Sequence, residues 1–202
     1  MTAQFTTELD RAACALREGA VIVCPSEGVY GLSCDATNEE AIAKIIALKR
    51  RDSAKGLIMV DCNRNFLNAH LDTERLNPKA LALMEHNWPG PHTFVVPVLE
   101  SFKSKAIRDD HTLAFRVTAF APLAALCKKL GRPLISTSAN ISGQRAVSTL
   151  DDLDISIIIG ADYVIAFECG GQSQPTSIYD TLTSTLIRQG PGFKENLWPR
   201  AM

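Results

Sequence analysis

The sequence lacks the usual signatures of ATP and dinucleotide binding. Its 202 residues contain no glycine–lysine dipeptide, which excludes a G-x-x-x-x-G-K-[S/T] loop, and they contain no G-x-G-x-x-G. Residues 171–175 (GQSQP) approach the G-x-S-x-G elbow of hydrolases but end in proline. A phosphate site in this chain would therefore be built from lysine, arginine, hydroxyl groups and loop amides.

Long apolar runs and paired metal ligands are also missing. No apolar run approaches the roughly 18–20 residues of a membrane span, so we expect no membrane segment. Residues 1–16 carry acids at Glu8 and Asp10 and have no long apolar core, so we expect no signal peptide. The six cysteines include no C-x-x-C pair, which favours reduced, mostly buried thiols in a cytoplasmic protein. The four histidines show no metal-binding spacing, so we expect no metal site made by the chain.

The charge of the chain is balanced overall but uneven along the sequence. With 21 Lys and Arg against 22 Asp and Glu, the net charge is -1. This balance argues against a protein whose whole surface is basic and binds nucleic acid. Residues 44–55, however, hold five cations and a single acid, Asp52. Clustered cations repel one another unless an anion shares the site, so this segment indicates an anionic ligand, most simply phosphate.

The hydrophobic pattern predicts one α/β domain with an open, twisted, mixed sheet and flanking helices. Residues 9–17 have the spacing of an amphipathic helix, and residues 20–25 that of a buried strand. A loop is predicted over residues 26–37, and Thr37 opens a capping box ahead of a second helix. The other predicted elements are strands 57–62, 93–99, 112–118, 133–137, 163–167, 176–180 and 185–189, helices 78–88 and 122–130, and an ambiguous segment 150–159.

The first candidate for the anion site is the end of the second helix. Lys49 and Arg51 are two residues apart beyond the last clearly helical position. In an extended chain they would share a face, reach one ligand and leave Arg50 pointing away. Arginine suits bidentate phosphate binding and lysine acts as a point charge. The alternative is that these cations cap the helix and favour its dipole.

Two loops that follow predicted strands are further candidates. Residues 136–143 (STSANISG) bring hydroxyls, an amide and a glycine to the end of a strand, where open α/β sheets bind ligands. Residues 25–32 (PSEGVYGL) offer Ser26 for a small polar ligand and Tyr30 as a pocket wall. The alternatives are a plain turn for the first loop and a packed tyrosine with a satisfied hydroxyl for the second.

Three residues on predicted strands complete the candidates. Arg116 lies inside strand 112–118, and a cation on a partly buried strand needs a partner. A ligand carboxylate is one candidate for that partner, and an ordinary Asp or Glu is the commoner one. Ser177 and Arg188 lie on late strands with the same ambiguity.

Six motifs occur together in the order of a known family. The chain resembles the YrdC-like family, and in particular its short bacterial members of the TsaC type, over residues 7–190. The tail 191–202 falls outside this domain. The motifs are residues 25–32, 49–51 with 55–57 (KRR, KGL), 88–91 (WPGP), 114–117 (AFRV), 136–143 and 186–190 (LIRQG).

The resemblance implies an enzyme that condenses L-threonine, bicarbonate and ATP to threonylcarbamoyl-AMP and pyrophosphate. Mg²⁺ would accompany ATP, and proteins of the TsaB, TsaD and TsaE type would pass the product to tRNA. The implied fold is an open α/β sheet around a concave basic cavity. The implied site comprises Lys49 and Arg51 as catalytic residues, Lys55, Ser138, Asn140 and Arg188 for the ATP phosphates, and Ser26, Tyr30, Arg116, Thr137 and Ser177 for threonine.

Two alternatives and one departure accompany this prediction. A non-catalytic module for double-stranded RNA or tRNA would use the same cations on a concave surface. A carbamoyl-transfer module is the other alternative, but the zinc-finger and acylphosphatase-like segments that accompany it are absent. The family loop commonly carries threonine at the positions of Ser26 and Gly28, so this chain lacks the hydroxyl that a threonine at position 28 would offer to the substrate.

Overall fold

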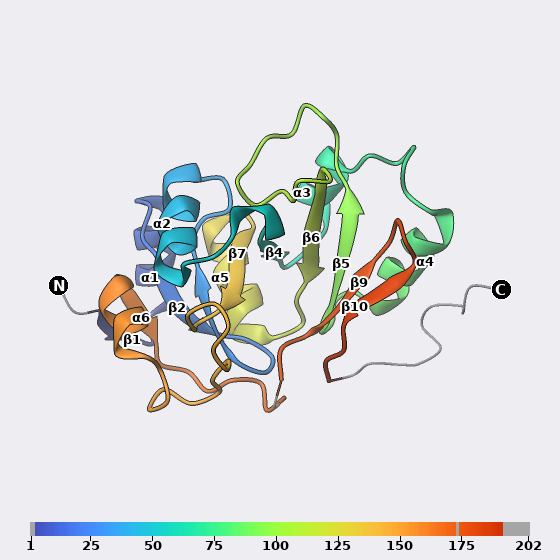
Figure 1. Cartoon of the computed structure of the whole chain (residues 1–202). Helices are drawn as coiled ribbons and strands as arrows, with labels where there is room; N and C mark the ends of the chain where they lie inside the picture. Colours follow the sequence, from blue (N-terminus) through green and yellow to red (C-terminus); the bar gives the residue numbers. More distant parts are fainter. Residues whose placement is uncertain (1–2, 173, 192–202) are drawn as a thin grey trace.

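Strands from the whole length of the chain form one ten-stranded sheet in the computed structural model, which describes residues 3–172 and 174–191 (Figure 1). Near both edges of the sheet, neighbouring strands come from segments that are far apart in the sequence. The order across the sheet is β1 (Gln4–Thr6), β8 (Tyr163–Ile165), β2 (Ile22–Pro25), β3 (Tyr30–Ser33), β7 (Leu134–Ser138), β4 (Ile58–Asp61), β6 (Thr112–Val117), β5 (His92–Pro97), β9 (Ser177–Asp180) and β10 (Thr185–Arg188).

The sheet is mixed, as the sequence predicts. Four neighbouring pairs are parallel: β1 with β8, β8 with β2, β4 with β6, and β5 with β9. The other five pairs are antiparallel, including the three around β7 and β3 at the centre. With helices on both faces, this arrangement confirms the expected α/β fold.

Helices cover the two faces because strand side chains alternate between them. On β2 and β4, Ile22 and Val60 pack into the cluster under α1 (Leu9–Arg17) and α5 (Ala121–Leu130), whereas Val23 and Met59 face the opposite cluster. That second cluster includes residues of α2 (Glu39–Lys49), α4 (Pro78–Asn87) and α6 (Ile155–Gly160). Helix α3 (Asn65–His70) and the 3-10 turn η1 (Ser53–Lys55) complete the elements. None of the helices in residues 3–172 and 174–191 is long and apolar enough to cross a membrane.

Some predicted local structure is wrong. The predicted loop 26–37 contains β3, whose hydrogen bonds to β2 and β7 supply order that its glycine-rich sequence does not signal. The cap of α2 is Asn38, which accepts bonds from Glu40 N and Ala41 N, and not Thr37, whose hydroxyl donates to Asp35. Helix α3 has no predicted counterpart. The ambiguous segment 150–159 forms α6 at its end.

Candidate functional site: a cationic cavity

A cavity of about 340 Å³ opens over the middle of the sheet, and strand register determines its floor. Ile58 on β4 pairs with Ala114 on β6 and with Ser136 on β7, and all three side chains line the cavity. Two residues further along, Val60 and Leu134 point to the same face but are buried under α5. The cavity therefore opens where α5 stops covering this face.

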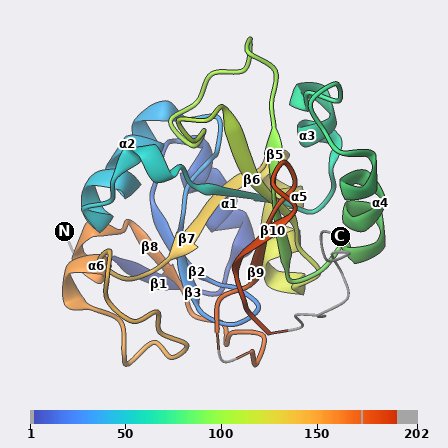
Figure 2. The same ribbon diagram turned by 45° about the vertical axis from the view of Figure 1, so that its right-hand side comes forward.

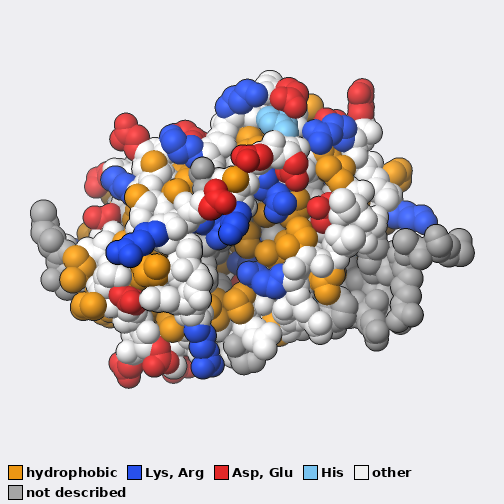
Figure 3. All heavy atoms as spheres, in the orientation of Figure 1, with side chains coloured by type: hydrophobic (Ala, Val, Ile, Leu, Met, Phe, Trp, Pro, Cys, Tyr) orange, Lys and Arg blue, Asp and Glu red, His pale blue; other side chains and the backbone are white. Residues whose placement is uncertain are grey.

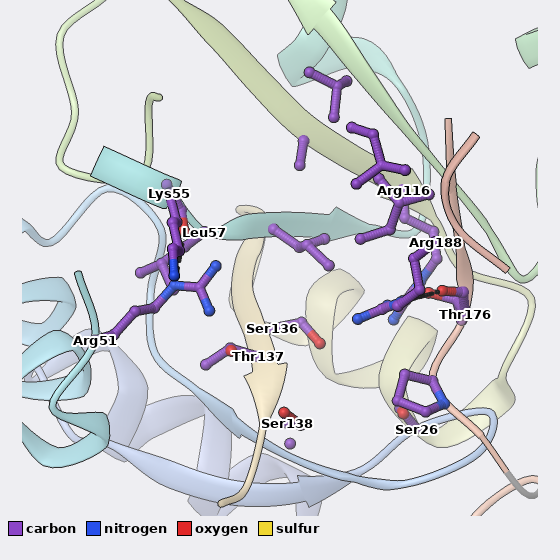
Figure 4. A pocket seen from close by; sticks show the side chains of 18 of the residues that line it. Ser26, Arg51, Lys55, Leu57, Arg116, Ser136, Thr137, Ser138, Thr176 and Arg188 are labelled. Carbon is purple, nitrogen blue, oxygen red and sulfur yellow. Dashed lines mark hydrogen bonds between the residues drawn. The ribbon is translucent and has the colours of Figure 1, made fainter. Parts of the chain in front are cut away.

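Cations reach the cavity from two opposite sides (Figure 4). Arg51 and Lys55 come from the segment that follows α2, and Arg116 and Arg188 come from β6 and β10, with the hydroxyls of β7 between the two groups. In the space-filling view, lysine and arginine side chains gather around a hollow at the centre of this face (Figure 3). The cations converge on one hollow that is open on this face, which suits a ligand with several negative charges.

Two arginines at the cavity, Arg51 and Arg188, are partly buried and lie near other positive charges. Burial lowers the pKa of Arg51, and nearby Arg108 lowers it further against the opposing effect of Asp52. Burial, followed by the charges of Arg116 and Arg51, lowers the pKa of Arg188 to about 10. Both shifts mean that positive charge is held here at a cost in free energy. A bound anion would remove that cost.

Arg116 has an acidic partner within the chain, which is the commoner of the two alternatives drawn from the sequence. Its guanidinium lies 3.2 Å from Glu27 Oε2, and both side chains are almost fully buried. Arg116 Nη1 also donates to Thr176 Oγ1 at 3.0 Å, while Arg188 donates twice to the Thr176 carbonyl. Thr118 Oγ1 donates to the other oxygen of Glu27 at 2.7 Å. These contacts hold Arg116 rigidly, and it still lines the cavity.

The prediction that Lys49 lies past the helix in extended chain is wrong. Lys49 is the last residue of α2, and the left-handed Arg50 (φ 49°) ends the helix. Lys49 is only 2% exposed, and its Nζ donates to the carbonyls of Ser138 and Asn140, to the latter at 2.8 Å. Burial, and then the charge of Arg51, lowers the pKa of Lys49 to about 8. Its ammonium therefore holds the loop after β7 in place.

A second hollow, of about 320 Å³, adjoins the cavity at this loop. Lys49 and Asn140 both line it, so the two residues that the sequence analysis assigns to one ligand do lie together. Arg51, Lys55 and Ser138 line both the hollow and the cavity. The amide of Asn140 donates to two loop carbonyls, and its Oδ1 is buried without a hydrogen-bond partner in the described part of the chain.

Several predicted site residues use their polar groups inside the protein. Ser26 lines the cavity, but its hydroxyl donates to Val29 O at 2.7 Å. Tyr30 is buried, its hydroxyl donates to Phe167 O at 2.6 Å, and burial raises its pKa to about 12. Ser177 accepts a hydrogen bond from Gly190 N, which ties β9 to the end of β10. Of the predicted residues on β7, Thr137 and Ser138 both line the cavity.

The structure adds residues that the sequence analysis does not propose. Glu27, Thr176, Ser136 and Arg108 take part in the site, through Arg116 or as lining residues. Glu27 and Ser136 lie within the quoted motifs, so position in a motif could have identified them. Arg108 lies in a long connection without a pattern. Among the described residues no three His, Cys, Asp or Glu side chains are grouped as metal ligands.

The departure at Gly28 has a steric reason. A Cβ built on Gly28 would lie 2.2 Å from the carbonyl oxygen of Gln174 and 3.0 Å from that of Gln172. The segment around these two residues is bonded along the 25–32 loop, since Gly170 N donates to Ser26 O and Gln172 N donates to Glu27 O. A threonine at position 28 would displace this segment.

The fold and the cavity define a protein with a mixed α/β sheet whose central, cation-lined cavity suits an anionic ligand. The chain belongs to the Sua5/YciO/YrdC family, since residues 14–190 match the family model described as "Telomere recombination". This confirms the resemblance drawn from the six motifs.

Individual relatives agree with the family match. Threonylcarbamoyl-AMP synthase of Xanthomonas campestris pv. campestris is 38% identical over 183 residues, which are 91% of this chain and 98% of that protein. The P. abyssi Sua5 structure complexed with L-threonine has a TM-score of 0.78 and 26% identity, covering 94% of this chain but 58% of that one. E. coli YciO has a TM-score of 0.79 and 22% identity, covers 95% and 96% of the two chains, and shows the fold alone.

Proposed function

We propose that this chain is a nucleotidyltransferase that condenses L-threonine, bicarbonate and ATP to threonylcarbamoyl-AMP, releasing pyrophosphate and water. The observation that carries the proposal is the convergence of Arg51, Lys55, Arg116 and Arg188 with the hydroxyls of β7 on one cavity. Relatives 38% identical over nearly their whole length bear the name of this activity, and a family structure is complexed with L-threonine. The catalytic domain extends over residues 7–190.

The reaction requires no protein nucleophile. The amine of threonine captures bicarbonate as a carbamate with loss of water, and a carbamate oxygen then attacks the α-phosphorus of ATP and expels pyrophosphate. The protein positions the reactants and neutralises the charge that builds on the phosphates. Arg116 and Arg188, which internal hydrogen bonds hold in place, suit this task because they need little reorganisation during the reaction.

The geometry suggests how the residues divide the work. Arg51 and Lys55 face the triphosphate, and Lys49 holds the loop of Ser138 and Asn140 against it. On the opposite side Arg116 binds the threonine carboxylate, and Arg188 reaches the α-phosphate. Thr137 and Thr176 line the cavity and are available for the threonine hydroxyl, whereas the hydroxyls of Ser26, Tyr30 and Ser177 are already bonded to backbone groups. Mg²⁺ would accompany ATP and would help to neutralise the charge of its phosphates.

The decisive experiment is pyrophosphate release from ATP and bicarbonate, with and without L-threonine. Release that depends on threonine, with threonylcarbamoyl-AMP detected by mass spectrometry, is the expected result. L-serine as a competitor tests recognition of the threonine methyl group. Tight, strongly salt-dependent RNA binding without ATP turnover would instead support the RNA-binding alternative.

The product would leave for a second reaction. Proteins of the TsaB, TsaD and TsaE type would take the adenylate and transfer its threonylcarbamoyl group to tRNA. Addition of such proteins and tRNA should therefore convert the product into modified tRNA, with release of AMP. If the protein makes the adenylate but no threonylcarbamoyl group reaches tRNA in the presence of these partners, synthesis would be supported and the proposed partners would be refuted.

A further inference from the structure

Arg108 is a fifth cation at the cavity, and it comes from the connection between β5 and β6. This connection arches over the top of the molecule in both views and returns beside the segment that joins α2 to β4 (Figures 1 and 2). The contact is direct, since Leu57 N donates to Ala106 O at 2.9 Å. The backbone of Arg108 is bonded on both sides: its N–H donates to Thr112 O, and its carbonyl accepts from His111 N. Arg108 is therefore held at a fixed place on the cavity wall.

Gly56 makes room for the Arg108 side chain. Gly56 has a φ of +57°, and a Cβ there would lie 2.8 Å from Arg108 Cγ and 2.7 Å from Ala106 O. A residue with a side chain would be strained in its backbone and would push the arginine stem away. The two segments thus fit together only with glycine at this position, and the stem of Arg108 lies directly on it.

The guanidinium of Arg108 is incompletely satisfied by the protein. Its Nε is buried and has no hydrogen-bond partner among the residues that the structure describes. Among the described residues, the acid paired with Arg108 is Asp110, whose Oδ1 lies 3.6 Å from Arg108 Nε. That oxygen already accepts a 2.5 Å hydrogen bond from Thr112 Oγ1. A planar fork of donors with one distant partner can bind two oxygens of a phosphate.

Its contact with Gly56 places Arg108 at one end of the cavity. Gly56 follows Lys55 directly, and a Cβ there would lie 2.8 Å from Arg108 Cγ, so Arg108 lies on the side of Arg51 and Lys55. The charge of Arg108 also lowers the pKa of Arg51. This side continues into the second hollow, which gives it the length for a chain of phosphates. The opposite side holds Arg116, which Glu27 already neutralises in part. The side with three cations suits a group with three or four negative charges better than a single carboxylate.

We propose that Arg108 is a pyrophosphate-binding residue that contacts the β- and γ-phosphates of ATP and the pyrophosphate that leaves. The inference rests on the proposed function for the reaction, but the anion contact itself can be measured with pyrophosphate alone. Arg108 completes a set of three cations whose other members belong to the segment after α2. It stabilises the negative charge that collects on the leaving group as the bond to the α-phosphorus breaks.

The test compares Arg108→Gln and Arg108→Lys with Lys103→Gln, a matched control. Lys103 lies in the same connection, its side chain is 75% exposed, and it does not line the cavity. Calorimetry measures pyrophosphate binding, and steady-state kinetics measure KM for ATP and for L-threonine. We expect about 10-fold to 100-fold weaker pyrophosphate binding in Arg108→Gln, as for a lost hydrogen bond to a charged group. KM for ATP should rise and KM for L-threonine should stay within about twofold. Arg108→Lys keeps a point charge but not the planar fork of donors, so its affinity for pyrophosphate should lie between those of wild type and Arg108→Gln.

The outcomes separate this inference from the proposed reaction. Pyrophosphate binding equal to wild type in a folded Arg108→Gln would overturn the role of Arg108, even in a fully active enzyme. If the glutamine variant does not fold, wild-type pyrophosphate binding by Arg108→Lys overturns the bidentate contact. A wild-type protein that binds pyrophosphate through Arg108 but releases none with threonine would refute the proposed function and leave the anion site standing.

Discussion

Glu27→Gln removes one charge of a buried ion pair while keeping the shape of the side chain. The carboxylate lies 3.2 Å from the Arg116 guanidinium, and the two side chains are 8% and 4% exposed. At an effective dielectric constant of about 20, two unit charges at this distance attract by about 5 kcal/mol. We expect a smaller loss of unfolding free energy, because the glutamine amide keeps part of the hydrogen bonding. Removing one partner of a buried ion pair typically costs about 3–5 kcal/mol.

Thermal and urea unfolding at neutral pH measure this loss. For a chain of this size, about 3 kcal/mol corresponds to a fall in Tm of roughly 6–12 °C. Thr118→Val is the matched control, since it leaves the charges in place and removes two hydrogen bonds, the 2.7 Å bond to the other Glu27 oxygen and the 3.1 Å bond from Phe120 N. Its cost should be about 2 kcal/mol.

A double-mutant cycle tests the physical reasoning directly. Arg116→Met alone leaves Glu27 buried without its cation, whereas the double variant Glu27→Gln/Arg116→Met removes both charges. The double variant should lose less stability than the two single variants added together, by about 2–3 kcal/mol. Single effects that simply add, or a Glu27→Gln variant as stable as wild type, would show that the pair contributes nothing to folding.

Three further predictions concern the loops around the cavity. Gly28→Ala should lower stability by about 1–3 kcal/mol, because its Cβ would meet the Gln174 carbonyl at 2.2 Å; an unchanged Tm would contradict this packing. The folded-state pKa of Lys49, about 8, lies below its ordinary value of 10.5, so the folded state binds fewer protons between these pH values. The free energy of unfolding should therefore rise with pH across pH 8–10.5 relative to Lys49→Met, and parallel urea profiles of the two proteins would refute the shift. Arg51→Ala should reduce kcat/KM about 10²–10³-fold with an unchanged Tm, whereas exposed Arg75→Ala should be neutral; full threonine-dependent pyrophosphate release by Arg51→Ala would exclude its role.

The sequence predicts the fold well where local patterns are strong. The amphipathic helix 9–17 matches α1 residue for residue, and Gly131 ends α5 in the left-handed conformation (φ 77°) that its position suggests. The prediction from sequence fails at β3. Gly31 and the buried Tyr30 lie there in a strand that is stabilised by its pairing with β2 and β7. Backbone pairing between distant segments leaves no periodic signal in a short glycine-containing stretch.

The composition and motifs of the chain by themselves predicted a site for an anion and two of the segments that line the cavity, because a cluster of cations and a run of hydroxyls can be read from the sequence. Only the tertiary structure decided how each residue is used. It buried Lys49 against the carbonyls of the loop after β7, paired Arg116 with Glu27, and brought Arg108 onto Gly56 beside the cavity. These outcomes depend on strand register and on where α5 stops covering the sheet, and both are set by packing between segments remote in the chain.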